Sequence, residues 1–477
     1  MIGRLARRAP GLWPPSSRAR DAAVRRSVVD VVLILGLAVY GGVVVALLVT
    51  GRLVPARAGA LLVGPVAFAI GLLRPEWLVV GLLALPYQFL DSASPKYLTY
   101  LLIWALFGFL LQDGVRVGPQ TGALPILGII VLAAVHPAQV PLAAETFAHE
   151  IWLLLCYYAA LMLLAFQATR TGRVTADQAA NALLIGIVAG ALVQPFINRL
   201  GPIEHGLLGT PWGGKFEYLS VMAFGVAYAR SSLRRANSYP SIRWDRVLTW
   251  TFAPLILIGY GRAGWAAAFI IVALVSRWLH WKRVWIGAAI VVGLLLTVPV
   301  LRERVLPTEG TGLSGTAAIT SISTGRWPLW VFLWDRAVLH LPGGNGFGYE
   351  WSLSSTEVFG TAGQFSRNQD FIFPHNDFLF LFVELGILGA GLLIVQWLHI
   401  AFTVHAAGRE TSPEAVRYGT RILVPVLVVM FCVQLFDNGF TIRAVAEHFY
   451  LVAGLVFGLS AWSRRTAHTS PMLAHAA

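Results

Sequence analysis

Charged residues are scarce in this sequence. Only 12% of its 477 residues are Asp, Glu, Lys or Arg, whereas 57% are hydrophobic and the mean hydropathy is +0.69. A soluble domain usually carries about 25% charged residues. The shortage of charge excludes an ordinary soluble globular protein and predicts an all-α, polytopic membrane protein.

Cysteine is also rare, and several catalytic signatures are absent. The two cysteines, Cys156 and Cys432, both lie in apolar runs, so the sequence predicts no disulfide framework. It contains no Asp-x-Asp, no His-Glu-x-x-His and no P-loop. We therefore predict no metal site, no cofactor and no direct use of ATP.

Long hydrophobic runs are abundant. A basic N-terminal segment leads into the apolar stretch 28–49, which is too long for a signal-peptide core and is interpreted as a retained first span. Further runs follow, the last at 445–462. They predict 12–14 transmembrane helices, 14 if every run crosses the bilayer and 12 if a weak early pair does not.

The distribution of Lys and Arg predicts the orientation. If all runs cross and the N-terminus is cytoplasmic, 24 of the 36 basic residues fall in inner segments, and the most basic inner loop is 230–246. The net charge of +13 is then mostly a topology signal, and we predict no nucleic-acid partner. The predicted organisation is a cytoplasmic segment at 1–27, transmembrane helices at 28–301, an extracytoplasmic loop at 302–375, C-terminal transmembrane helices at 376–462 and a cytoplasmic tail at 463–477.

The predicted outer loop 302–375 has about 74 residues and is far longer than most of the others. Loops of this length in compact architectures are usually functional or disordered. Within it, Trp327, Trp330, Trp334 and Val338 recur at helical spacing. This pattern predicts an amphipathic helix at the membrane interface, with its tryptophans at the level of the lipid headgroups.

A polar pentapeptide, FPHND, follows at the point where this loop re-enters the membrane. Its His375 can exchange protons near neutral pH. A carboxylate, Glu384, lies within the apolar run that follows, where a charge is costly. Each has a simpler interpretation, because His375 could cap a helix and Glu384 could form a hydrogen bond between helices.

Two arginines share the predicted outer side with His375. Arg262 lies in a tight turn, and Arg326 opens the amphipathic helix. Guanidinium groups bind diphosphate oxygens through paired, charge-assisted hydrogen bonds. The three residues would suit a lipid-diphosphate donor, with His375 accepting the proton of an incoming sugar hydroxyl. A single arginine at a membrane edge can also simply anchor a helix against the headgroups.

Several of these motifs together resemble the O-antigen ligase/polymerase superfamily. The resemblance is carried by Arg326-Trp327, by the Pro-Gly-Gly-x-Gly turn at 342–346, and by His375-Asn376 followed by Glu384-x-Gly386-x-x-Gly389. It is best over about 250–400. The N-terminal half agrees only as a set of apolar spans.

The resemblance implies a GT-C-type membrane glycosyltransferase of the bacterial cytoplasmic membrane. Its donor would be an undecaprenyl-diphosphate-linked glycan, and its acceptor a saccharide or glycolipid. Transfer would be inverting, metal-independent and extracytoplasmic. His375 would take the catalytic position and Arg262 and Arg326 the diphosphate-binding positions, with Asn376, Glu384 and Lys215 in support. Gly-Arg-Ala-Gly replaces the usual Ser-Arg-Gly at Arg262, and Lys215 stands in a turn that often bears asparagine.

Two alternatives stay open from the sequence. A peptidoglycan-type polyprenyl-dependent transferase would use an acid of the outer loop as its base. A transporter or flippase for lipid-linked sugars would show symmetric halves and charged residues near mid-membrane. The sequence does not distinguish a ligase from a polymerase and does not identify the sugar.

Overall fold

The computed structural model describes residues 68–85, 105, 118–140, 142–197, 216–236, 243–258, 262–277, 326–353, 375–409 and 412–474. The chain divides into two compact units, one formed by 1–74 and 104–114 and the other by 75–103 and 115–477. Every candidate site residue belongs to the second unit.

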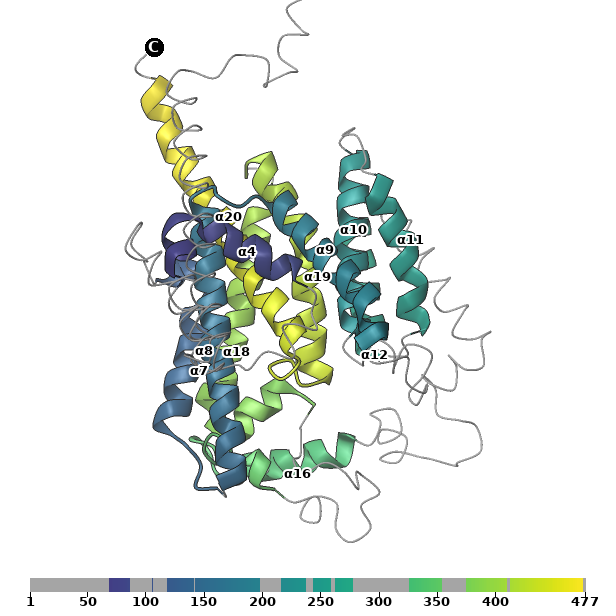
Figure 1. Cartoon of the computed structure of the whole chain (residues 1–477). Coiled ribbons are helices and arrows are strands. Elements are labelled where there is room, and N and C mark those ends of the chain that lie inside the picture. Colours follow the sequence, from purple (N-terminus) through teal and green to yellow (C-terminus); the bar gives the residue numbers. More distant parts are fainter. Residues whose placement is uncertain are drawn as a thin grey trace, which may run out of the picture. The chain divides into compact units, whose positions relative to one another are not determined.

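The second unit is built of helices (Figure 1), and within the described ranges its only β-pairing is an isolated bridge between Pro137 and Phe347. Its main helices are α4 (Pro75–Ala84), α7 (Leu124–Val135), α8 (Leu142–Arg170), α9 (Ala176–Ile197), α10 (Phe216–Ala236), α11 (Arg243–Ile258), α12 (Arg262–Arg277), α16 (Arg326–Leu339), α18 (Asp377–Ala407), α19 (Glu414–Phe436) and α20 (Arg443–Ala474). The described residues also form two short 3-10 turns, η2 (Pro119–Thr121) and η3 (Glu350–Ser352).

Four described helices are long and apolar enough to cross a bilayer. They are Glu145–Arg170 within α8, α18, α19, and Arg443–Arg464 within α20. This confirms an all-α, multi-pass membrane protein. The helix predicted from the tryptophan spacing is present as α16.

Helices α8 and α20 are in extensive contact. Gly454 and Gly458, one helical turn apart on α20, lie directly against the backbone of α8. A Cβ atom at Gly454 would stand 2.2 Å from the carbonyl oxygen of Met162, and one at Gly458 would stand 2.7 Å from that of Phe166. Small residues at this spacing let transmembrane helices approach closely.

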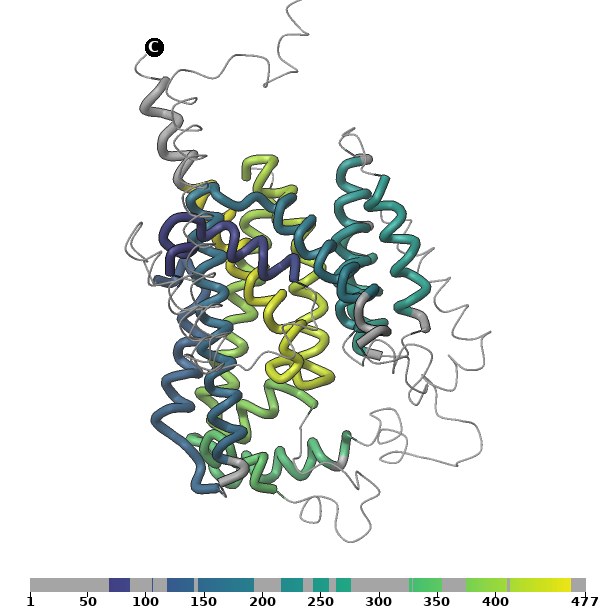
Figure 2. The backbone as a smooth tube through the Cα atoms, viewed as in Figure 1, coloured from purple at the N-terminus to yellow at the C-terminus, as the bar shows by residue number. Residues whose placement is uncertain are grey.

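Helices α10, α11 and α12 form a second group, drawn in teal in Figure 2, that packs on α19. Gly225 of α10 lies against Pro425 inside α19, so the two helices are in close contact. This contact matters for the site because α10 and α19 each contribute polar groups at one end of the bundle.

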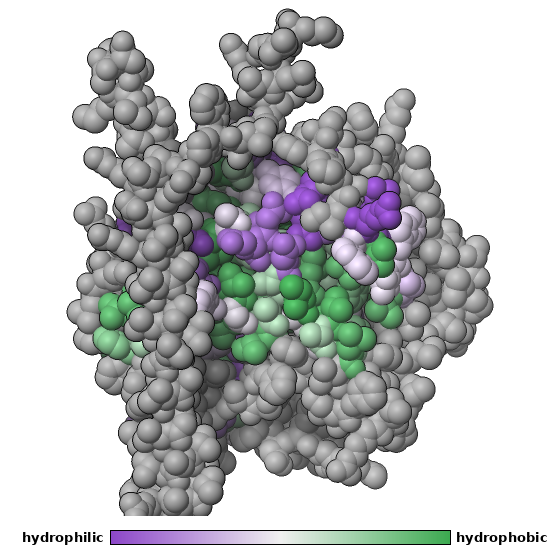
Figure 3. Space-filling model, turned by 45° about the horizontal axis from the view of Figure 1, so that its top comes forward, coloured by the Kyte–Doolittle hydropathy of each residue, from purple (hydrophilic) through white to green (hydrophobic). Residues whose placement is uncertain are grey.

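Polar side chains gather at the opposite end, where α10 finishes and α9, α11 and α19 begin. Arg230 forms an ion pair with the fully buried Asp245 and donates to Asn181, and Arg234 bridges to Asp177 at 3.0 Å. Figure 3, tilted so that the upper end of Figure 1 comes forward, shows hydrophilic side chains gathered above a largely hydrophobic surface. This end coincides with the predicted inner segment 230–246.

Helix α18 is broken, although its sequence reads as one continuous span. Gly386 has φ +64° and ψ −154°, in the left-handed half of backbone space that favours glycine. A Cβ atom there would lie 1.9 Å from the carbonyl oxygen of Pro342, so another residue would clash. The turn at 342–346 docks into this break and redirects the first part of α18.

Candidate functional site

His375 adopts a left-handed backbone conformation, with φ +51°. Non-glycine residues rarely do so, although His is enriched among those that do, and such strain clusters at functional sites. Its backbone N–H donates to Asn438 Oδ1 at 2.8 Å. The next residue, Asn376, donates to the carbonyl oxygen of Leu435 at 3.0 Å. The segment between α19 and α20 therefore holds His375 in this conformation.

The His375 ring is paired with a carboxylate. Its Nδ1 lies 3.0 Å from Asp437 Oδ1, and the other oxygen, Oδ2, accepts a hydrogen bond of 2.8 Å from the Tyr218 hydroxyl. Because an ionised carboxylate only accepts hydrogen bonds, Nδ1 carries the hydrogen and Nε2 is the ring atom able to take a proton. The side chain of His375 is one-third exposed, so this ring is accessible.

The surroundings of Asp437 keep it charged. Burial acts to raise the pKa of Asp437, but the hydrogen bond and charge of His375, the Tyr218 hydroxyl and the charge of Arg326 together lower it below its ordinary value. Asp437 is thus a carboxylate throughout the range in which imidazole titrates. It can hold the histidine tautomer and stabilise the imidazolium that forms after proton transfer.

Arg326 joins the same cluster from α16. Its Nη1 donates to the carbonyl oxygen of Phe436, the last residue of α19 and the one before Asp437. A helix C-terminus leaves such carbonyls without intrahelical partners and attracts cations. The guanidinium thus stands beside the imidazole–carboxylate pair.

Asn376 starts α18. Its side-chain oxygen accepts a 2.9 Å hydrogen bond from the backbone N–H of Leu379, which is the usual N-cap arrangement. Asp377, next along the chain, is buried and accepts from the backbone N–H of Phe440. These two residues fix the start of α18 against the segment that carries Asp437. They support the site without offering a free proton acceptor.

Glu384 has a structural environment. Its carboxylate accepts backbone hydrogen bonds from Gly348 and, at 2.7 Å, from Glu350, and the side chain is fully buried. The carbonyl of Glu384 accepts from Gly346 at 2.9 Å, and that of Val383 accepts from Asn345 at 2.9 Å. Glu384 therefore fastens the glycine-rich turn and η3 to the broken part of α18.

Glu350, whose backbone N–H donates to Glu384, carries a second buried carboxyl group. Its side chain is fully buried, and burial, followed by the nearby carboxylates of Glu384 and Asp377, raises the pKa of Glu350 well above its ordinary value. Among the described residues its carboxyl oxygens have no hydrogen-bond partner. An acid so placed is out of reach of a bulky acceptor.

The second arginine of the predicted trio, Arg262, begins α12. Two residues later, Gly264 lies against Glu217 of α10, the neighbour of Tyr218. The backbone of Arg262 therefore reaches the end of the bundle that carries the site, while its side chain lies outside the described atoms. Lys215 also lies outside the described residues, one position before α10.

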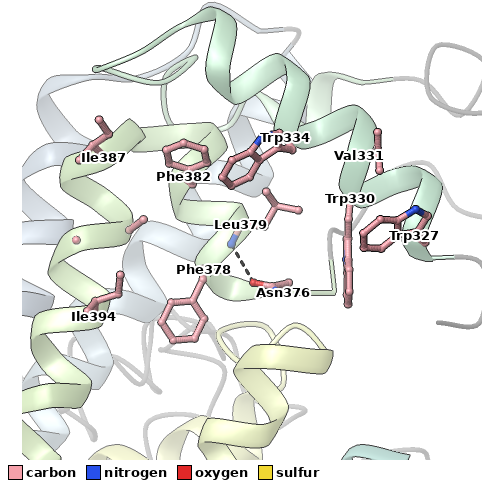
Figure 4. Close-up of a pocket in the computed structure, with 12 residues that line it drawn as sticks. Trp327, Trp330, Val331, Trp334, Asn376, Phe378, Leu379, Phe382, Ile387 and Ile394 are labelled. Carbon is pink, nitrogen blue, oxygen red and sulfur yellow. Dashed lines mark hydrogen bonds between the residues drawn. The ribbon is translucent and has the colours of Figure 1, made fainter. Parts of the chain in front are cut away.

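An apolar groove adjoins His375 (Figure 4). It has a volume of about 730 Å³ and runs between α16 and the two arms of the broken α18. Trp330 and Trp334 line one side, Phe378 and Phe382 the first arm of α18, and Ile394 the second arm. The polar side chain of Asn376 also lines it. Exposed hydrophobic side chains flank it, Ile387 at 53% and Trp334 at 55%.

The part of the chain that the structure describes holds no group of three or more His, Cys, Asp or Glu side chains arranged for a metal ion. The chemistry of the cluster is instead that of an imidazole–carboxylate pair beside a guanidinium. Such a group can remove a proton from a hydroxyl and stabilise negative charge nearby.

The apolar helices and this cluster define a multi-pass membrane protein with an imidazole, a carboxylate and a guanidinium gathered at one end of its helical bundle. Residues 247–394 match the family model described as O-Antigen ligase. This match over about a third of the chain supports the O-antigen ligase/polymerase superfamily, a family of glycan transferases. No curated protein matches the chain.

The matched segment includes Arg262, Arg326 and His375, whereas Tyr218 and Asp437 lie outside it. The sequence analysis missed both. Asp437 could have been found, because the alternation of spans places the segment after 421–436 on the same predicted side as His375. Tyr218 carried no such signal, since a tyrosine at the start of an apolar run is an ordinary interfacial residue.

Proposed function

We propose that this protein is a membrane glycosyltransferase of ligase or polymerase type. It would move a saccharide from a polyprenyl-diphosphate carrier to a hydroxyl of a glycan or glycolipid acceptor. The observation that carries the proposal is the His375–Asp437 pair, 3.0 Å apart, beside Arg326. We place the reaction on the extracytoplasmic face of a bacterial cytoplasmic membrane, following the Lys and Arg distribution.

In the proposed step, the oxygen of the acceptor hydroxyl attacks the anomeric carbon of the donor sugar. The bond from that carbon to the diphosphate oxygen breaks, and the diphosphate leaves with the bonding electrons. The hydroxyl proton passes to His375 Nε2, while Nδ1–H stays on Asp437. Attack opposite the leaving group inverts the configuration at the anomeric carbon.

The arginines would receive the charge that the leaving diphosphate develops. Arg326 stands beside the pair, and the start of α12 brings Arg262 to the same end of the bundle. Fixed guanidinium groups act on such a charge without reorganising during the reaction. This role replaces the metal ion that many sugar-nucleotide transferases use, and we propose that transfer here is metal-independent.

The apolar groove supports a donor with a lipid chain. Asn376, the residue after His375, lines it, so a hydrophobic chain in the groove would have its polar head near the cluster. An imidazole base fits better than Glu350 or Asp377, because both of these acids are buried. A peptidoglycan-type mechanism with such an acid is therefore the weaker candidate.

The test is transfer by the purified protein in lipid vesicles, supplied with a polyprenyl-diphosphate-linked glycan and candidate acceptors. We expect His375→Ala to lower the rate at least 10²-fold, the usual contribution of a general base, while insertion into membranes is unchanged. Normal transfer by this variant would remove the assigned base. Product size separates the two subclasses, since a polymerase lengthens the glycan and a ligase attaches it once.

A further inference from the structure

Tyr218 makes a contact that the proposed mechanism does not yet use. It lies in the first turn of α10, and its hydroxyl donates to Asp437 Oδ2 at 2.8 Å. The side chain is 8% exposed, so water competes little for this hydrogen bond. The residue is 219 positions from Asp437 in the chain and lies outside the segment that matches the family model.

The two oxygens of Asp437 have different partners. Oδ1 accepts from His375 Nδ1 and from the backbone N–H of Asn438, and Oδ2 accepts from Tyr218. A carboxylate held at both oxygens cannot rotate about its χ2 angle without losing a bond. The Tyr218 hydroxyl also withdraws electron density from the carboxylate, which makes it a weaker partner for the imidazolium form of His375.

We propose that Tyr218 is a positioning residue for glycan transfer, which fixes Asp437 so that its other oxygen holds His375 in the proton-accepting tautomer. This inference rests on the proposed function, and it adds a residue of α10 to the machinery built by α16, α18 and α19. The charged and titratable groups around this contact are His375 and Asp377 of the α18 start, Glu217 of α10, and Arg326 of α16.

Tyr218→Phe removes the hydroxyl and leaves the ring. We expect kcat to fall about 5- to 20-fold with KM for donor and acceptor within about twofold, because the base is misplaced while the binding groups stay. Asp437 then binds the imidazolium form of His375 more strongly. The acidic limb of the pH–rate profile should move to higher pH by about half a unit, the order of one neutral hydrogen bond.

Tyr158→Phe is the matched control. The Tyr158 hydroxyl is also buried and donates at 3.0 Å to the backbone carbonyl oxygen of Phe440, in the same segment between α19 and α20, whereas the Tyr218 hydroxyl donates to the Asp437 carboxylate. It measures the loss of a buried hydroxyl near the site. We expect its pH–rate profile to match that of the wild type.

A second variant tests the direction in which the pH–rate profile moves. 3-Fluorotyrosine at position 218 has a more acidic phenol and a stronger hydrogen bond to Asp437, so the acidic limb should move to lower pH. It also serves if the phenylalanine variant fails to fold. Unchanged profiles for both variants, or equal losses in Tyr218→Phe and Tyr158→Phe, would overturn the positioning role.

A chemical readout separates this inference from the proposed function. Diethylpyrocarbonate modifies neutral imidazole, and the pH dependence of His375 modification can be followed by mass spectrometry without any glycan substrate. Its midpoint should rise in Tyr218→Phe and fall with 3-fluorotyrosine. These shifts in a protein that transfers no glycan would sustain the positioning role and reject the proposed function. Glycan transfer with unchanged pH midpoints of His375 modification would sustain the proposed function and reject the positioning role.

Discussion

Two carboxylates near the start of α18 perform contrasting tasks. Asp437 accepts hydrogen bonds from the side chains of His375 and Tyr218, whereas Glu384 accepts them from the backbone N–H groups of Gly348 and Glu350. A side chain such as imidazole can change its protonation state, but a backbone amide cannot. The hydrogen-bond partners of the two carboxylates therefore differ in kind, because one partner of Asp437 can exchange a proton and the backbone partners of Glu384 cannot.

Among variants that test the contrast between Asp437 and Glu384, we expect Asp437→Asn to lower glycan transfer the most. The amide lacks the charge that stabilises the imidazolium and can favour the wrong tautomer of His375. We expect kcat for glycan transfer to fall about 10²- to 10³-fold, measured in vesicles with the lipid-linked donor. Asp335→Asn, an exposed acid on α16, is the control. Wild-type kcat in Asp437→Asn would contradict the assignment.

Arg326→Lys should give the next largest effect. An ammonium loses the planar set of donors that can bind the carbonyl of Phe436 and a diphosphate together. We expect kcat/KM to fall about 10- to 50-fold, by about 1.5–2.5 kcal/mol in transition-state binding. Arg336→Lys on the same helix, where the guanidinium lies over the Phe332 ring, should be near normal. Equal losses in the two variants would argue against a role in diphosphate binding.

A smaller effect is expected in the apolar groove. Trp330→Ala removes a large part of its wall, and we expect KM for the lipid-linked donor to rise about 10-fold, in line with roughly 1.5 kcal/mol of lost apolar contact. A donor with a shortened polyprenyl chain should not distinguish the variant from wild type. Trp250→Ala, on the exposed face of α11, is the control. A KM rise that persists with the short chain would place the lipid elsewhere.

The smallest effect on catalysis is expected for Glu384→Gln. This variant is the most direct test of the contrast between Glu384 and Asp437. The amide offers one oxygen to two backbone donors, so one buried hydrogen bond is lost at about 1–3 kcal/mol. We expect transfer within about twofold of wild type, but faster hydrogen–deuterium exchange across 342–353. Glu414→Gln, an exposed acid on α19, is the control. A large loss of kcat with unchanged exchange would give Glu384 a catalytic role.

The local pattern of apolar and aromatic residues predicted much of the fold. Apolar runs predicted α18, α19 and α20, and the spacing of Trp327, Trp330 and Trp334 predicted α16. It did not predict the break in α18. An isolated glycine in an apolar run looks like an ordinary helical position, and the contact that decides otherwise comes from Pro342, 44 residues earlier. Such long-range contacts leave no periodic signal in a sequence.

The site was only partly predictable for the same reason. His375 and Arg326 were found because each stands in an informative local setting, and the structure brings both to the end of α19. Asp437 and Tyr218 act only through distant partners. The role of Glu384 was left open by the sequence, because its backbone partners become neighbours only when the glycine-rich turn docks.

The break in α18 at Gly386 also determines how a molecule with a lipid chain and a polar head would approach the site. Since the backbone changes direction there, residues on both sides of the break line the apolar groove, and Asn376, the neighbour of His375, lines it as well. A lipid-linked saccharide that enters from the bilayer would therefore keep its lipid chain in apolar surroundings and its saccharide among polar side chains.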